Sequence, residues 1–446
     1  MLTTGELLAG VARVDITPPV GIEMFGYHRS SPMTNIHDPL WLTALALVAE
    51  HTPSYPCLLL AIDNVGLGWQ TTQALRAAVA ATARTPLERV AIYYSHTHAG
   101  PDSEVLDWYG HERPVNSPER LYGAMLPQWA ASAARLALQR LTLARVGCST
   151  ATSITGVNWR KRGNDGRAFM GVNPAGPVDQ QVTVLRIDTA DQRPLATVVH
   201  YGVHGTVFKS DNFACSADVT GAVRNVIESA TGGICLFAQG AAGDVNPRWR
   251  GDEAALKRCG CELGGAALQA FATAEMHPLY ALTTAVERVT LRLSPLPDEA
   301  TAVQLAEEVS RIWEAPTEPW LDLVRHKLAA NERHLTLVRE LHAVRVNEFV
   351  RVGIPMEPFA ELSLAFRERT ASLATGEHPL CLCFGGYTNG TPGYLAMADE
   401  YRAGGYEIEW MPVVYGYYEG LLAPPVPETG DEVVAAAVRL ATHLCR

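Results

Sequence analysis

Two histidines lie at the end of an apolar segment. His96 and His98 occur in the sequence Tyr-Ser-His-Thr-His-Ala-Gly-Pro, directly after the apolar residues 90–93. The apolar run is typical of a buried strand, and the Ala-Gly-Pro sequence predicts where that strand ends. Side chains two residues apart on an extended backbone point the same way, and imidazole is a common metal ligand. The pair predicts a metal or acid–base site; a polar loop with two incidental histidines is the alternative.

A second apolar run ends in the same way. Residues 197–203 are mostly apolar and are followed by His204 and Gly205. Two core strands that each deliver a histidine at their ends have the geometry that a metal site needs. His200 lies on the same side of this strand but deeper, and it is a weaker candidate ligand. The glycine-rich residues 239–247 end a third apolar run, and they predict either an anion-binding nest of backbone amides or a plain tight turn.

Further polar candidates lie outside these strands. Glu357 lies where the apolar run 349–354 gives way to a helix. Tyr394 and Tyr406 lie in a region dense in glycine and tyrosine, which predicts an aromatic-walled pocket. Gly26 lies in a long loop, where a backbone without Cβ can approach a ligand closely.

Strands and helices alternate along the chain, which predicts the α/β class. We expect a single domain, residues 1–446, with a mixed β-sheet core flanked by helices and with β-hairpins at 182–203 and 343–354. Residues 147–169 read as irregular. Charged segments with helical apolar spacing predict a helical hairpin inserted at about 298–342, on the outside or as a lid. The other helices are expected at 70–83, 118–139, 221–229, after 359, and at 431–445.

Composition excludes several classes of function. The chain has 446 residues, 48% of them hydrophobic, and a net charge of −11 without a basic cluster, so neither nucleic acid nor an anionic membrane surface is an expected partner. No segment has the ~18 uncharged apolar residues of a membrane helix. The N-terminus lacks the pattern of a secretory signal. The nine scattered cysteines indicate reduced core thiols, so we expect a cytoplasmic protein.

Several stretches together resemble the catalytic domain of the neutral/alkaline non-lysosomal ceramidase family. Each is weak alone, but they follow the family's order and cover nearly the whole chain. The matching stretches are residues 13–18 with 25–27, 95–101, 203–206, 239–247, 357–359, and 389–394 with Tyr406 twelve residues on.

The resemblance implies a zinc amidase. Four of the residues identified above would hold one zinc ion: His96, His204, Glu357 and Tyr394. Three would bind the substrate or its transition state: His98, Arg160 and Tyr406. Arg160 is the least secure of these, because Arg162 is two residues away. Gly26 would also contact the substrate.

The chemistry of these residue types agrees with the resemblance. Two imidazoles, a carboxylate and a phenol form a ligand set that suits zinc and leaves a position for water. Zinc lowers the pKa of such a water toward ~7 and polarises an amide carbonyl. His98 is then the predicted general acid for the leaving amine. We therefore expect a zinc-dependent hydrolase of a C–N amide bond.

The sequence also departs from the ceramidases. It ends at residue 446, before the family's C-terminal immunoglobulin-like domain, and Asn246 stands where many ceramidases have serine. These departures favour a small soluble N-acyl amide as the substrate. The alternatives are a true ceramidase acting on a sphingolipid amide, a two-metal amidohydrolase barrel, and a non-catalytic binding protein with a degenerate site. The barrel would need a bridging lysine and eight regular strand–helix units, which the hairpins disfavour.

Overall fold

A mixed sheet of eight strands is formed by segments of residues 7–239. The structure, a computed structural model, describes residues 5–49, 55–106, 111–375, 378–391 and 393–445. In spatial order the strands are β12 (Ile234–Gln239), β10 (Pro194–Tyr201), β9 (Gln181–Thr189), β6 (Thr142–Thr152), β1 (Leu7–Asp15), β3 (Trp41–Ala49), β4 (Cys57–Ile62) and β5 (Val90–Tyr94). The pairs β4–β5 and β10–β12 are parallel, and the other pairs are antiparallel. The mixed sheet expected from the sequence is confirmed.

This sheet curls until its two edge strands, β5 and β12, contact each other. Gln239, at the end of β12, fastens the two edges. Its side-chain nitrogen donates to the carbonyl oxygens of Ser95, at 3.0 Å, and Val203, at 2.7 Å. The curl brings the loops after β5 and β10 together, although these strands are far apart in the sheet order.

A second sheet packs against one face of the first. Its strands, in spatial order, are β14 (Leu282–Arg292), β15 (Thr336–Val346), β16 (Phe349–Gly353) and β18 (Cys381–Gly385). Apolar side chains of both sheets, among them Leu45 and Leu185 from the first and Val344 and Phe349 from the second, form one buried cluster between them. The core is therefore two stacked sheets.

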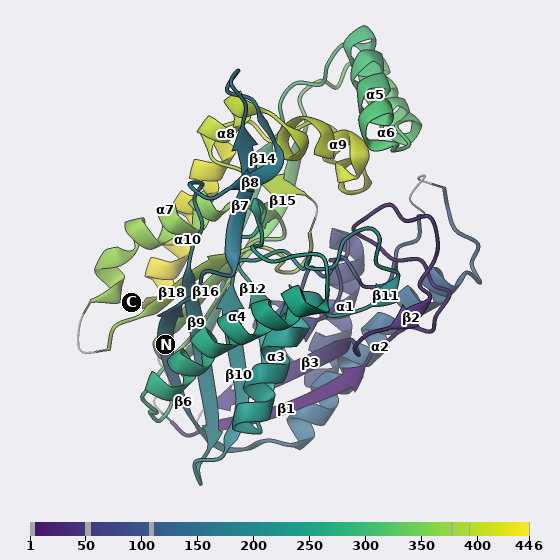
Figure 1. The fold of residues 1–446 in the computed structure, drawn as a ribbon. Coiled ribbons are helices and arrows are strands. Elements are labelled where there is room, and N and C mark those ends of the chain that lie inside the picture. The colour runs from purple at the N-terminus through teal and green to yellow at the C-terminus, as the bar shows by residue number, and fades with distance from the viewer. Residues whose placement is uncertain (1–4, 50–54, 107–110, 376–377, 392, 446) are drawn as a thin grey trace.

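Helices cover the two outer faces, so the molecule has four layers (Figure 1). The helices on the first sheet are α1 (Trp69–Ala83), α2 (Pro118–Gln139), α3 (Asp218–Thr231) and α4 (Glu253–Thr273). Those on the second are α7 (Ala360–Arg369) and α10 (Thr429–Cys445). The expected start of α2 is confirmed: the Ser117 side chain accepts a hydrogen bond from the Arg120 amide, and Pro118 is the first helical residue.

The helical hairpin is shorter than predicted. It consists of α5 (Glu299–Trp313) and α6 (Glu318–Ala329), which project at one end of the molecule (Figure 1). Residues 336–342, predicted as helical, belong to β15, where Leu337 pairs with Leu291 of β14. The apolar residues Leu328, Leu335 and Val338 happen to follow helical spacing, so the period assigned to this segment was wrong.

The prediction of an irregular segment at 147–169 was also wrong. After β6, residues 156–173 form β7 (Gly156–Arg162) and β8 (Ala168–Asn173), which join β13 (Val245–Pro247) in a small sheet. These strands have no clear alternation of apolar residues, and they are stabilised by pairing with distant segments. The remaining short elements are β2 (Asn35–Ile36), β11 (Ala214–Cys215), β17 (Glu357–Pro358), β19 (Tyr394–Leu395), α8 (Ala398–Ala403), α9 (Met411–Val414), a π-turn at Tyr406–Trp410 and 3-10 turns at Leu87–Arg89, Ala371–Ala374 and Gly416–Glu419.

Two further features concern the cysteines and the helices. All nine cysteines fall within the described residues, and each is a free thiol. In the described part of the chain, no helix combines the length and the apolar character needed to cross a bilayer.

Candidate active site

His96 lies in a turn after β5 rather than on an extended strand. Its backbone has φ +58°, a left-handed conformation that is uncommon for a residue with a side chain. The imidazole is buried, and its Nδ1 bonds to the carbonyl oxygen of Val65. The turn directs Nε2 toward His98, whose Nε2 is 3.2 Å away. The two histidines therefore meet as expected, but a turn brings them together.

His204 approaches the same point from β10. Its Nδ1 lies 2.6 Å from the carbonyl oxygen of Ala242, and its Nε2 lies 3.0 Å from Nε2 of His96. The loops that carry these histidines also pair through their backbones, because the His98 amide donates to the carbonyl of Gly205 at 2.8 Å. Gly205 has to be a glycine, since a Cβ there would lie 2.6 Å from the carbonyl oxygen of His96.

Glu357 brings a carboxylate from the second sheet. It follows β16, and its short strand β17 pairs with β19, opposite Tyr394. Oε2 lies 3.2 Å from Nε2 of His96 and 3.6 Å from Nε2 of His204, whereas Oε1 accepts a hydrogen bond from the Tyr415 hydroxyl at 2.8 Å. Burial raises the pKa of Glu357, but positive charge on the imidazoles of His96 and His204, the place that a bound cation would take, outweighs it and lowers that pKa to about 2. The carboxylate is therefore ionised.

These three groups fit a single cation. Since Nδ1 of His96 and of His204 each faces a carbonyl oxygen, Nδ1 carries the hydrogen and Nε2 presents a lone pair. Lone pairs that face each other and an ionised oxygen repel unless a positive charge lies between them. Ligand atoms about 2 Å from a tetrahedral zinc ion lie roughly 3.3 Å apart, close to the 3.0 to 3.6 Å separations observed.

His98 differs from the other two histidines in its second nitrogen. Its Nδ1 is buried and has no hydrogen-bond partner among the described residues. The pKa of His98 lies well below its usual value. Burial is the largest cause, and the neighbouring His96 and His204 lower this pKa further. Gly26 packs against this ring, because a Cβ on Gly26 would lie 2.5 Å from Cγ of His98. His98 is thus a neutral imidazole held by packing.

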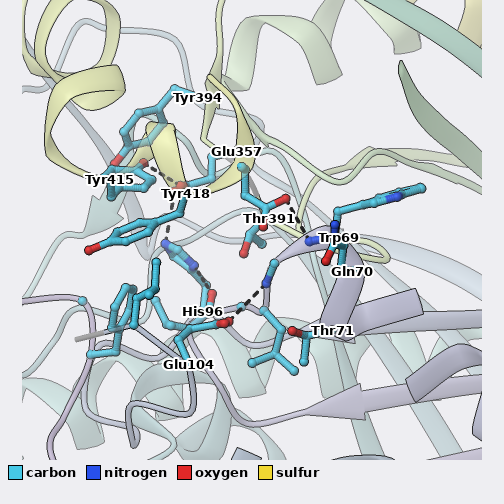
Figure 2. Close-up of a pocket in the computed structure, with 18 of the residues that line it drawn as sticks. Trp69, Gln70, Thr71, His96, Glu104, Glu357, Thr391, Tyr394, Tyr415 and Tyr418 are labelled. Carbon is cyan, nitrogen blue, oxygen red and sulfur yellow. Dashed lines mark hydrogen bonds and ion pairs between the residues drawn. The ribbon is translucent and has the colours of Figure 1, made fainter. Parts of the chain in front are cut away.

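The histidine cluster opens into a cavity of about 640 Å³. Four tyrosines line it near Glu357: Tyr394, Tyr406, Tyr415 and Tyr418. Figure 2 shows Tyr394 and Tyr415 on the side of Glu357, with Trp69, Gln70 and Thr71 across the cavity. Burial first, and the charge of Glu357 second, raise the pKa values of Tyr394, Tyr406 and Tyr415. These phenols are therefore hydroxyl donors at neutral pH.

Polar groups that sequence reasoning missed also line the cavity, and we call them the polar wall: Glu104, Arg339 and Glu419. The Gly68 amide donates to Glu104 at 3.2 Å, and the Trp69 amide, at the start of α1, donates to Glu419 at 2.9 Å. Burial raises the pKa of Glu104 to about 7. The Arg339 Nε is buried without a hydrogen-bond partner among the described residues.

Arg160 does not reach the cavity. Its side chain is only 2% exposed, and its nitrogens bond to the carboxylate of Glu400 at 2.6 Å, to the carboxylate of Glu407, and to the carbonyl of Gly404 at 2.7 Å. Glu407 is adjacent to Tyr406, so Arg160 holds the segment that carries this tyrosine. The structure thus does not bring Arg160 to the position of a substrate ligand.

The glycine-rich loop 239–247 behaves as a turn. The amides of Gly240, Gly243 and Val245 donate to the carbonyls of Tyr201, Pro358 and Ala242, so they do not point into the cavity. The side chain of Asn246 accepts a hydrogen bond from the Thr206 hydroxyl at 2.7 Å. Of the two interpretations of this loop, the geometry favours the tight turn over the anion nest.

His200 is not part of the cluster. It is buried in β10, where its Nδ1 lies 3.1 Å from the carbonyl oxygen of Ala238 and 3.4 Å from Nε of Arg351. The grouped imidazoles are those of His96, His98 and His204, whose ligand atoms all lie within 4.8 Å of one another.

Comparisons with known proteins agree with this architecture. The family described as "Neutral/alkaline non-lysosomal ceramidase, N-terminal" matches residues 7–278, more than half of the chain. A structure described as "Ceramidase complexed with C2" aligns with a TM-score of 0.71 and 16% identity, over 98% of this chain and 75% of that one. The neutral ceramidase of Pseudomonas aeruginosa aligns with a TM-score of 0.71 and 15% identity, over 99% and 75%. At these identities the structures establish a shared fold. A comparison with curated protein sequences gives no match.

Proposed function

The chain belongs to the neutral/alkaline non-lysosomal ceramidase family, and we propose that it is a zinc-dependent amidase that hydrolyses the C–N bond of a small N-acyl substrate. One observation carries the proposal. The unprotonated nitrogens of His96 and His204 converge with the ionised oxygen of Glu357 at one end of the cavity, with spacings that suit ligands of one ion. Two imidazoles and a carboxylate are ligands of catalytic zinc.

In this proposal His96, His204 and Glu357 hold the ion, and Tyr394 is the fourth ligand. The Tyr394 backbone pairs with that of Glu357, and its side chain lines the same cavity. When bound, zinc polarises the amide carbonyl and lowers the pKa of a water toward ~7. The carbonyls of Val65 and Ala242 keep the two imidazoles in the ligating tautomer, and Tyr415 holds the carboxylate in place.

His98 is the proposed proton carrier. Ligating histidines almost always donate their second ring nitrogen to a partner, and that of His98 has none among the described residues. Its low pKa leaves it neutral. A neutral imidazole at this position can accept the proton of the attacking water and then deliver it to the leaving amine nitrogen.

The tyrosines are the proposed donors to the developing oxyanion. Tyr406 lines the cavity and is protonated at neutral pH, so its hydroxyl can donate a hydrogen bond to the carbonyl oxygen as that oxygen gains charge. Arg160 then contributes by positioning Tyr406 through Glu407 rather than by contacting the substrate. Gly26 contributes by admitting the His98 ring.

The polar wall supports a small polar amide over a long-chain lipid. Hydrocarbon placed against Glu104, Arg339 and Glu419 would remove water from these groups without replacing their hydrogen bonds, which is costly. A substrate that carries a polar or charged group in addition to its amide would satisfy them. N-acyl amino acids are the first compounds to test.

Hydrolysis of ceramide itself is the second candidate, and the family match favours it. A panel containing N-acyl amino acids, short-chain ceramides and esters separates the two. If kcat/KM is at least tenfold higher for the N-acyl amino acids than for the short-chain ceramides, the small-amide proposal is supported. The reverse order supports a ceramidase. Retention of a panel compound without turnover would indicate a binding protein.

The metal assignment is tested with His96→Ala. We expect this variant to contain about one zinc equivalent less than the wild type and to lose activity, because one of three close ligands is removed. His334→Ala, at an exposed histidine, is the matched control. Full zinc content together with full activity in His96→Ala would refute the assignment, and two ions held by the cavity cluster would favour the amidohydrolase alternative.

A further inference from the structure

A second group of possible ligands lies outside the cavity wall. It contains His277, which lies between α4 and β14, Glu348, in the turn between β15 and β16, and His378, which precedes β18. None of the three lines the cavity. Their spacing along the chain does not predict a shared site, because they come from three separate loops.

The three side chains are close enough to share an ion. Oε1 of Glu348 lies 3.9 Å from Nε2 of His277 and 3.8 Å from Nδ1 of His378. One ligand atom from each residue lies within 4.8 Å of the other two. A point equally distant from three such atoms lies roughly 2.8 Å or less from each of them. That distance is at most about 0.7 Å longer than a zinc–nitrogen bond. A rotation of the half-exposed His378 ring can supply that movement.

The Glu348 carboxylate gives an independent reason to expect a cation. Its side chain is 8% exposed, and neither carboxylate oxygen accepts a hydrogen bond from a cationic side chain of the described residues; the neighbouring hydroxyl of Tyr280 interacts with it as a neutral donor. A buried carboxylate without a positively charged partner is costly. Arg345, three residues before Glu348, does not satisfy it, because this guanidinium donates to the carbonyls of Asn347, at 3.0 Å, and Leu444, at 2.9 Å.

We propose that His277, Glu348 and His378 bind a second divalent metal ion, of the zinc type. Two imidazoles and one carboxylate suit zinc, and cobalt can replace it as a probe. The side chains of His277 and His378 are 30% and 51% exposed, so the ion exchanges with solvent and keeps water in its remaining positions.

This second ion links the two sheets. The backbone of His277 exchanges hydrogen bonds with Val146 of β6, in the first sheet. The carbonyl of Glu348 accepts from the amide of Cys381, at the start of β18 in the second sheet. A metal held by both therefore stabilises the stacking of the sheets and takes no part in the hydrolysis.

The experiment is a zinc titration of the chelator-treated full-length protein, followed by metal analysis and thermal unfolding. We expect two equivalents of Zn²⁺ in the wild type and one in His277→Asn/His378→Asn. This double variant should keep the wild-type kcat while losing the part of the Tm increase that the second equivalent gives. His326→Asn/His334→Asn, at two exposed histidines of the helical hairpin region, is the matched control.

A second variant keeps the test decisive if the double variant does not fold. Glu348→Gln should raise the Tm of the metal-free protein, since it removes an uncompensated charge, and should abolish the second equivalent. A double variant that binds as many equivalents of zinc as the wild type would overturn the proposal. These readouts do not require amidase activity, so they stand apart from the test of the catalytic centre.

Discussion

At the scale of single residues, the second nitrogen of each imidazole distinguishes ligand from reactant. His96 and His204 each bond to a backbone carbonyl through Nδ1, whereas Nδ1 of His98 has no partner in the described chain. Three residues of the same type thus receive different chemistry from their surroundings. Gly26 is part of those surroundings, because its missing side chain leaves room for the His98 ring.

Substitution of Gly26 tests this packing. Gly26→Ala should lower kcat about a hundredfold, since a Cβ placed 2.5 Å from the His98 ring displaces it. Gly21→Ala is the matched control, because Gly21 also has φ +94° but has no heavy atom near its Cβ position. Steady-state kinetics on both variants separate the displacement of His98 from backbone strain. Equal kcat values in the two variants would contradict the displacement of His98.

The pKa of Glu104 predicts a pH dependence of stability. Burial raises this pKa from 4.5 to about 7, so between these values the folded protein keeps a proton that the unfolded chain has lost. Stability therefore falls as the pH rises through this window, by about 3 kcal/mol at most. In Glu104→Gln the fall should be smaller, as measured by urea unfolding at pH 5 and pH 8. Glu307→Gln, at an exposed glutamate, should leave the wild-type difference intact, and an unchanged difference in Glu104→Gln would contradict the prediction.

At the scale of elements, a buried arginine on β7 fixes the segment that carries Tyr406. Arg160→Ala leaves the carboxylates of Glu400 and Glu407 buried with fewer partners, which should cost about 3–5 kcal/mol of folding free energy. Arg162→Ala, on the same strand and paired with the same Glu400, should cost about 1 kcal/mol or less because Arg162 is 38% exposed. Chemical denaturation measures both, and similar losses would contradict this account.

Trp313 of the helical hairpin contacts a tyrosine of the candidate active site. The ring of Trp313, at the end of α5, lies 4.5 Å from the ring of Tyr406. Trp313→Ala should lower kcat severalfold with a small change in Tm, because it removes the support of Tyr406 without opening the stacked sheets. The neighbouring Ile312 is 43% exposed, so Ile312→Ala is the control. If Trp313→Ala kept the wild-type kcat, the hairpin would have no part in placing Tyr406.

Sequence patterns predicted the elements whose signal is local. Strand-end histidines, the glutamate before α7 and the capped start of α2 all lie near the predicted positions. The missed parts depend on contacts between distant segments. These contacts are the carbonyls that orient the imidazoles, the hydroxyl of Tyr415 on Glu357, and the hydrogen bonds by which Gln239 joins the two edges of the first sheet. Strand β7 was missed for the same reason, since its pairing partners β8 and β13 supply the order that its own residues do not signal.

At the scale of the whole molecule, the proposed catalytic ion would join both sheets. His96 and His204 follow strands of the first sheet, whereas Glu357 follows a strand of the second. Removal of the ion should therefore loosen the stacking of the sheets as well as abolish activity. At free zinc a thousandfold above Kd, binding stabilises the folded state by about 4 kcal/mol.

Calorimetry of the His277→Asn/His378→Asn variant, with and without chelator, measures how much zinc at the catalytic cluster alone stabilises the folded protein. We expect a single transition with zinc, and a lower Tm with a broader or divided transition without it. An unchanged Tm after zinc removal would show that the sheets do not depend on the ion.

The residues that line the cavity come partly from turns at strand ends and partly from connecting segments. This division determines how the substrate specificity of the cavity can change. The histidines and Glu357 sit on turns fixed by strand ends, while other lining residues, at 66–68, 104–106 and 418–420, belong to connecting loops and a short 3-10 turn. Exchanges in those loops can redirect the enzyme to new amides during evolution while the hydrolytic machinery is inherited intact. A library of substitutions confined to the loops is therefore the most direct route to engineered variants that accept a different acyl donor.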